Sequence, residues 1–168
     1  MLKVYVYPDP VLICKAKPVQ TINRHLRRLV DEMFETMYEE RGVRLAAPQV
    51  GKGIRLCVIN CTGDEADALV LINPQIIEAS EEQVTDEEGC LSVPGIRSNV
   101  TRPERVKVRA YDVDGNKLEL DADGLQARCL QHEIDHLNGR LFFQRLGSAA
   151  RMLIGRRIKR LEEEFKDA

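Results

Sequence analysis

The sequence predicts one α+β domain, in which mixed or antiparallel strands pack around a central helix and a further helix lies toward each end of the chain. Three observations predict this class: an amphipathic pattern at residues 21–42, β-type runs between residues 54 and 122, and a second helical pattern at residues 123–139. The chain of 168 residues suits one sizeable core, and it contains no repeat, low-complexity tract or linker. We therefore expect residues 1–168 to form a single domain.

The first helix is predicted by apolar residues that recur near i, i+3 and i+4 within residues 21–42. Thr21 is the expected N-cap, and Gly42 is the expected C-terminal stop. The stretch before it, up to Gln20, is expected to be extended because prolines interrupt it.

Four runs rich in β-formers predict strands at residues 54–60, 69–77, 105–113 and 117–122. The last two flank Asp114-Gly115, a strong signal for a β-hairpin turn.

The second helix is expected to begin at Asp123, with Gln126 completing a capping box, and to end at Asn138-Gly139. Its apolar residues form one stripe, and His132 and His136 fall roughly opposite that stripe. We therefore expect one face of this helix to be buried and the other to face a site. A final helix is expected at residues 148–166.

Composition excludes several classes of function. The net charge of −2 gives no general attraction to DNA or to an acidic membrane. The N-terminal segment has neither the apolar run nor the cleavage site of a signal peptide, and no stretch reaches transmembrane length. Five scattered cysteines in a chain without an export signal favour reduced thiols in a cytoplasm.

Two histidines at i and i+4 predict a metal site on the second helix. The imidazoles of His132 and His136 project from the same side, so both can bind one cation. Glu133 lies beside the ligand line, where a carboxylate can act as the base toward metal-bound water. The competing interpretation is a pair of surface histidines on a polar helix face.

A catalytic site of this kind normally has three protein ligands, so a third donor is expected. His25 lies among arginines in the first helix, where we expect it to be exposed. Cys129 shares the histidine face, but the helical rise places it roughly 10 Å from His136, too far for one small ion. Cys90, in a Gly-Cys-Leu-Ser-Val-Pro-Gly bend, is the leading candidate, although spacing alone leaves other donors open.

Three segments of the sequence resemble the signatures of the peptide deformylase family. They are "GVRLAAPQ" at residues 42–49, "EGCLS" at residues 88–92 and "HEIDHLNG" at residues 132–139. They occur in the family's order and at its separations, and "YPDP" and "LINP" are also similar to that family.

The resemblance implies a metal-dependent hydrolase that removes the N-formyl group from the initiator methionine of new polypeptides and releases formate. It implies the metal ligands Cys90, His132 and His136, with Fe(II) as the native ion and Zn, Ni or Co accepted. Glu133 is implied as the general base and acid. Gln49 and the backbone N–H of Leu91 are implied as donors to the oxyanion.

Four residues are our candidates for contact with the substrate. Leu125 and Cys129 share the histidine face, and Val43 lies in the segment leading to Gln49, so these side chains are expected to line the methionine pocket; core packing is the alternative. The fourth is Arg44, which stands where the family usually has glycine. Arg44 either points to solvent or fills the cleft beside the substrate, which would alter substrate choice or weaken the enzyme.

Two further functions compete with a deformylase: a repurposed deformylase-like protein, as Arg44 suggests, and a zinc peptidase, which needs a third His or Glu ligand. A binding protein for nascent chains or ribosomes is the non-enzymatic alternative. It would use five basic residues of the last helix, which can contact ribosomal RNA. They are Arg151, Arg156, Arg157, Lys159 and Arg160. Asp135 is either a solvated charge or the partner of Arg102, in which case the pair would steady the second helix.

Overall fold

The structure, a computed structural model, describes all residues from Met1 to Ala168. Its helices and strands follow one another in the order α1 (Pro10–Ile13), α2 (Arg24–Glu39), β1 (Arg44–Ala46), β2 (Leu56–Ile59), β3 (Leu69–Ala79), β4 (Gln83–Cys90), β5 (Val93–Pro103), β6 (Arg105–Tyr111), β7 (Lys117–Asp123), α3 (Gly124–Leu137) and α4 (Ser148–Asp167). Short 3₁₀ turns, η1 (Ala47–Val50), η2 (Glu65–Asp67) and η3 (Phe142–Arg145), lie between them.

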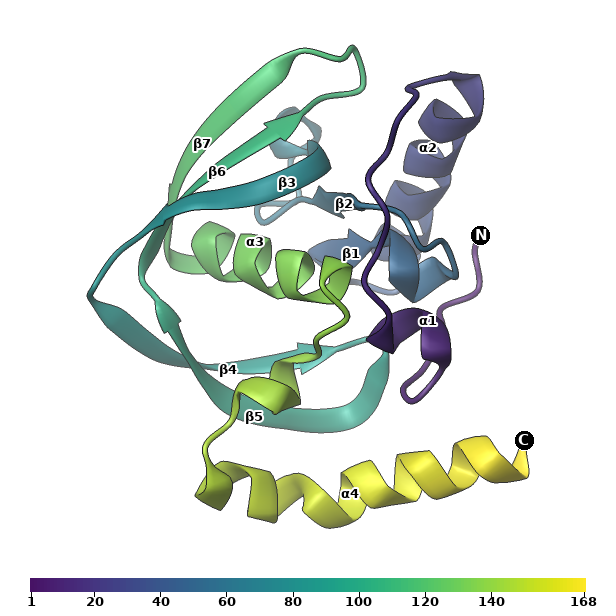
Figure 1. Cartoon of the computed structure of the whole chain (residues 1–168), viewed down its shortest axis with the longest axis vertical. Helices are drawn as coiled ribbons and strands as arrows, with labels where there is room; N and C mark the ends of the chain where they lie inside the picture. Colours follow the sequence, from purple (N-terminus) through teal and green to yellow (C-terminus); the bar gives the residue numbers. More distant parts are fainter.

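Helix α3 occupies the centre of the molecule, between two antiparallel sheets (Figure 1). The larger sheet has five strands in the order β1-β2-β3-β6-β7, and the smaller one is the β4–β5 hairpin. This arrangement confirms the predicted α+β class with antiparallel strands around a central helix and helices near both ends. The predicted 105–122 hairpin is also confirmed, since β6 and β7 pair in register across a turn with Gly115 at φ +80°.

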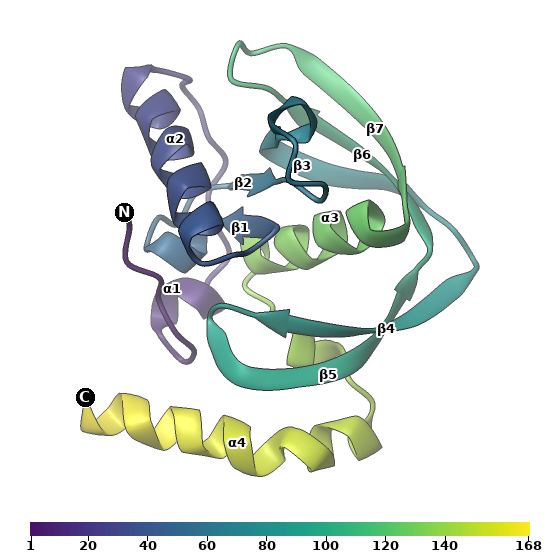
Figure 2. The ribbon, with the colours of Figure 1, turned by 180° about the vertical axis from the view of Figure 1, so that it is seen from behind.

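Both faces of α3 are covered: the apolar face is buried, as predicted, and the other face points toward a site, as predicted, but is buried as well. Every residue from 127 to 137 is buried, including the polar side chains of the histidine face. The apolar stripe packs with Cys57, Leu71 and Val108 of the large sheet. The β4–β5 hairpin passes along the other side of the helix (Figure 2).

The β4–β5 hairpin was not among the predicted strands. Gln83 pairs with Pro103, and the register runs down to Gly89 opposite Arg97. After a register shift Cys90 pairs with Val93, so that Leu91 and Ser92 form the turn. The bend expected around Cys90 is therefore the tip of a long hairpin, which brings the thiol to the middle of the molecule.

Details of three helices differ from the predictions. Asn23, not Thr21, caps α2, because its Oδ1 accepts a hydrogen bond from the N–H of Leu26 at 3.0 Å. Asp123 does precede α3, but its side chain makes no capping hydrogen bond, so the predicted capping box is wrong. The short helix α1 also interrupts the stretch that was expected to be extended.

Helix α4 lies along the outside of β5, and Ile154, Ile158 and Leu161 face an apolar cluster that includes Val93 and Phe143. None of the helices combines the length and the apolar character that crossing a membrane requires.

Candidate metal centre

Two segments far apart in the sequence bring three metal-binding atoms together. Sγ of Cys90, at the tip of the β4–β5 hairpin, lies 3.4 Å from Nε2 of His136. Nε2 of His136 lies 3.2 Å from Nε2 of His132, one turn earlier on α3. The three donor atoms all lie within 4.8 Å of one another, and no other group of His, Cys, Asp or Glu side chains meets that criterion.

The spacing of these atoms fits a single cation. Bonds of about 2.0–2.1 Å to nitrogen and 2.3 Å to sulfur place two donors at tetrahedral corners roughly 3.4–3.6 Å apart. The two observed contacts of 3.2 and 3.4 Å are close to those separations. Three donors leave a fourth corner free, as catalytic sites require. His25, by contrast, is exposed on α2.

Both imidazoles are in the neutral form that can bind a metal. Burial, with a smaller contribution from the nearby Arg44 guanidinium, lowers the pKa of His136 to about 3. Burial also holds the pKa of His132 well below its usual range. Nδ1 of His132 lies 2.8 Å from Oε1 of Glu88; because a carboxylate only accepts, Nδ1 carries the proton and Nε2 keeps its lone pair.

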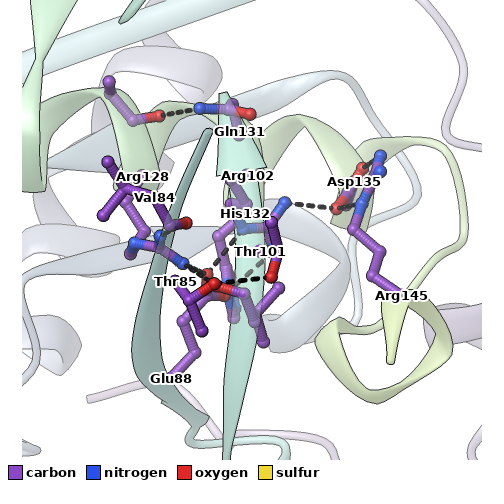
Figure 3. Close-up of polar contacts among 12 residues, drawn as sticks. Val84, Thr85, Glu88, Thr101, Arg102, Arg128, Gln131, His132, Asp135 and Arg145 are labelled. Carbon is purple, nitrogen blue, oxygen red and sulfur yellow. Dashed lines mark hydrogen bonds and ion pairs between the residues drawn. The ribbon is translucent and has the colours of Figure 1, made fainter. Parts of the chain in front are cut away.

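Glu88 anchors a buried network of charges that joins the hairpin to α3 (Figure 3). Its carboxylate accepts from Nε and Nη2 of Arg102 at 2.6 and 2.9 Å and from Nη1 of Arg128. Burial alone would raise the pKa of Glu88, but the hydrogen bonds from His132 and Arg102 outweigh it and hold the pKa below its usual range. The carboxylate therefore stays ionised and fixes the orientation of His132.

Asp135 extends the same network on the next turn of α3. Nη1 of Arg102 donates to its Oδ2 at 2.9 Å, which confirms the Arg102–Asp135 pair over the solvated charge. Arg145, in η3, donates to both oxygens of the same carboxylate (Figure 3). The sequence analysis gave no role to Glu88, Arg128 or Arg145. The one available signal was the position of Glu88 at the start of the Glu-Gly-Cys segment.

Glu133 lies at the bottom of the site with its side chain fully buried. Burial raises the pKa of its carboxyl group to about 8, although the guanidinium of Arg44 opposes the rise. Neither carboxylate oxygen has a hydrogen-bond partner among the protein atoms. An unpartnered buried carboxylate beside three metal-binding atoms can accept a proton from a bound water and pass it on.

Gln49 is oriented toward the three donors by η1. Its Oε1 accepts the N–H of Ala46 at 3.0 Å, so its amide nitrogen faces the other way. That nitrogen lies 3.2 Å from Oγ of Ser92 and 3.5 Å from Sγ of Cys90. Leu91 follows Cys90 in the hairpin turn, so its backbone N–H belongs to the same corner of the site.

A cleft of about 740 Å³ leads from the surface to Glu133 and His132. Val43 and Leu125 line it, and Leu125 is 52% exposed. Cys129 is placed elsewhere: it is buried in the core between α3 and the large sheet, with its sulfur 3.7 Å from that of Cys61. Arg44 fills part of the cleft rather than pointing to solvent, with Nε 3.4 Å from Oε1 of Glu133.

Comparison with known proteins agrees with this site. Residues 1–152 match the family model described as polypeptide deformylase. The chain belongs to the polypeptide deformylase family. A peptide deformylase of Chromobacterium violaceum is 48% identical over 164 residues, which cover 98% of each protein. One of Acidobacterium capsulatum is 50% identical over 158 residues, covering 93% of this chain and 92% of that protein.

Solved deformylase structures share the fold. The crystal structure of Arabidopsis thaliana peptide deformylase 1B in complex with an inhibitor superposes with a TM-score of 0.95 at 39% identity, covering 99% of this chain and 93% of that one. This deformylase is therefore an enzyme that removes the N-formyl group from formyl-Met nascent peptides, and it is metal-dependent like its family. Nothing in the comparisons supports a zinc peptidase or a repurposed protein. The zinc peptidase also lacks its third His or Glu ligand, because the third member of the donor group is a cysteine.

Proposed function

We propose that Cys90, His132 and His136 bind the catalytic cation, with Fe(II) as the native ion and Zn, Ni or Co as substitutes. The observation that carries this proposal is the convergence of one thiol and two imidazole nitrogens from the hairpin tip and α3. A mixed sulfur and nitrogen donor set suits several divalent transition metals, so the choice of iron rests on the family resemblance. When bound, the cation supplies a water of lowered pKa and a Lewis acid for the formyl oxygen.

Glu133 is proposed as the group that moves the proton. Its buried carboxylate accepts no hydrogen bond from the protein, and only Oε1 faces the Arg44 guanidinium, which leaves the group available to take a proton from the attacking water. The protonated carboxyl then gives that proton to the amine of the departing peptide, which would otherwise leave as a strong base. Both transfers use the same side chain, so its loss should abolish turnover.

Gln49 and the N–H of Leu91 are proposed as donors to the oxygen that becomes negative as the formyl carbon turns tetrahedral. The bond from Ala46 N–H to Oε1 of Gln49 fixes which end of the amide faces the site. A preorganised donor of this kind is typically worth about 3 kcal/mol in the barrier. Val43 and Leu125 are proposed to contact the methionine side chain. For Cys129, which packs in the core, we propose only an indirect contribution as support beneath that wall.

The experiment that tests these assignments combines metal analysis with formate release after anaerobic purification. We expect the protein to hold one equivalent of iron and to release formate from formyl-Met peptides. Glu133→Ala should retain the metal and lose turnover, whereas Cys90→Ser should lose iron sharply. Cys14→Ser is the matched control, because Cys14 is exposed and away from the site. Metal lost in Glu133→Ala, or retained in Cys90→Ser, would reassign the ligands.

Finally, we propose that residues 1–168 form a single catalytic domain that works in the cytoplasm and contacts ribosomes transiently through α4. Contacts of α3 with strands of both sheets support one domain, and five free thiols fit a reducing compartment.

The five basic residues of α4 are exposed while Ile154 faces inward, so the helix can present positive charge to ribosomal RNA. Salt-sensitive cosedimentation with ribosomes, lost in Arg156→Glu/Arg160→Glu, tests the contact; formate release from free peptides should not change.

A further inference from the structure

The side chain of Arg44 crosses the cleft from one wall to the other. Arg44 begins β1, which is the edge strand of the large sheet. Its Nη2 donates to the backbone carbonyl of Gly89 in β4 at 2.6 Å. Its Nε lies 3.4 Å from Oε1 of Glu133, and the side chain is only 19% exposed. The guanidinium therefore joins β1 to β4 directly above the proposed base.

This bridge occupies the route that a substrate must use. Arg44, Gly89 and Glu133 all line the same cleft, which ends at Glu133 and His132. A formyl group can reach Glu133 only from the cleft, because the base and the ligands are otherwise enclosed by protein. A peptide and the Arg44 side chain therefore compete for the same space.

The attachment of Arg44 is weak compared with that of its neighbour Arg128, which also lines the cleft. Arg128 donates to Glu88 and to the carbonyls of Val84 and Val100, so it is fixed in the wall. Arg44 makes one hydrogen bond, to Gly89, and one ion pair, while its Nε has no acceptor.

Nη2 of Arg44 also lies 3.5 Å from Nδ1 of His132, but that atom already carries a proton given to Glu88. The contact is therefore not a hydrogen bond, and the side chain can be displaced without breaking a network.

We propose that Arg44 is a gating residue for substrate: in the resting enzyme its side chain lies across the cleft beside Glu133, and a formyl-peptide must displace it from the Gly89 carbonyl before reaching Glu133. The proposal rests on the proposed function of this site. Apparent affinity falls by the fraction of molecules whose cleft is open. A hydrogen bond to a charged donor corresponds to roughly a ten- to hundred-fold preference for the closed form. Removing the side chain should therefore lower KM by at least about ten-fold.

Three variants separate gating from other roles of the side chain. Arg44→Gly removes it, Arg44→Met keeps most of its bulk without donors or charge, and Arg44→Lys restores one charged donor. We would measure kcat and KM for formate release from formyl-Met-Ala-Ser by the nickel-loaded enzymes, with Arg105→Ala as control. Arg105 lies on β6, outside the cleft, in exposed ion pairs with Glu82 and Glu104.

Gating predicts that kcat/KM rises about ten-fold in Arg44→Gly and Arg44→Met because KM falls. The KM of Arg44→Lys should lie between those of these two variants and that of the wild type. Arg105→Ala should leave both kcat and KM unchanged. An unchanged KM in both the Gly and Met variants would overturn the proposal. A fall in kcat at constant KM would also overturn it, since Arg44 would then be assisting Glu133 rather than closing the cleft.

A binding measurement keeps gating distinct from the proposed reaction. Calorimetry with the product peptide Met-Ala-Ser should show about ten-fold tighter binding to nickel-loaded Arg44→Gly than to the wild type. Tighter binding with no formate release by any of the enzymes would support the gate and refute the proposed reaction. Formate release by the wild type with equal peptide binding by both proteins would refute the gate alone.

Discussion

Replacing Glu88 by glutamine removes one negative charge from the network that holds His132. The Glu88 carboxylate accepts four hydrogen bonds, from Arg102, Arg128 and His132, and it is 3% exposed. Breaking a buried ion pair from one side typically costs about 3–5 kcal/mol. Arg102 keeps its bond to Asp135, and Arg128 keeps two carbonyl acceptors, so we expect the lower end, about 3 kcal/mol.

The assay is urea unfolding of metal-free protein, because a bound metal would add its own linkage to the free energy of unfolding. A loss of about 3 kcal/mol corresponds to a fall in Tm of roughly 6–12 °C for a chain of this size. Chelator competition should also show metal affinity reduced about 10–100-fold, since glutamine no longer fixes the tautomer of His132.

Glu87→Gln is the matched control for Glu88→Gln. Its side chain is 60% exposed in a pair with Arg97, and exposed pairs contribute little. If the free energy of unfolding of Glu88→Gln lies within about 1 kcal/mol of the wild-type value and metal affinity is unchanged, the network does not hold the imidazole of His132 in place.

Three further predictions concern the pocket and the core. Leu125→Trp should raise KM for formyl-Met peptides by crowding the cleft; kinetics equal to the wild type would remove Leu125 from the pocket. Leu130→Ala should lower the free energy of unfolding by about 2–5 kcal/mol, because Leu130 is fully buried; a loss below 1 kcal/mol would contradict its place in the core. Gly139→Ala should cost at least about 1–2 kcal/mol, since φ is +75° and the new Cβ would lie 2.8 Å from the carbonyl oxygen of Ile13. Gly155→Ala, in open space on α4, should instead stabilise the protein by about 0.5–1 kcal/mol in the same urea titration, and equal effects at the two glycines would refute the steric argument.

The elements that the sequence predicted well are those with a strong local signal. The 105–122 hairpin carries an Asp-Gly turn between two β-rich runs, and α3 carries both an apolar stripe and histidines at i and i+4. The β4 strand has neither kind of signal. Its residues from 83 to 87 are all exposed, and all but Val84 are polar, so the alternation that marks a half-buried strand is missing.

The β4–β5 hairpin also explains why the polar face of α3 is buried, which the sequence did not indicate. A helix with one apolar stripe is expected to expose its other face, unless another element covers that face. The β4–β5 hairpin does so, and it places Glu88 and Cys90 against the polar side of α3. Glu88 is one of three consecutive acidic residues, and only its place at the start of the Glu-Gly-Cys segment distinguishes it from exposed Asp86 and Glu87.

A buried network of arginines and carboxylates is an expensive way to stabilise a fold, since an apolar replacement of similar volume is often as stable. In this protein the network holds neighbouring elements in position. Glu88 stands two residues before Cys90 and binds His132, so one carboxylate fixes both the strand that carries the thiol and the helix that carries the imidazoles. Arg44 lacks any comparable anchor, and its single hydrogen bond is to a backbone carbonyl. The charges beside the three donor atoms are therefore held by several partners each, whereas Arg44, which lies across the cleft, is held by one hydrogen bond and its ion pair with Glu133.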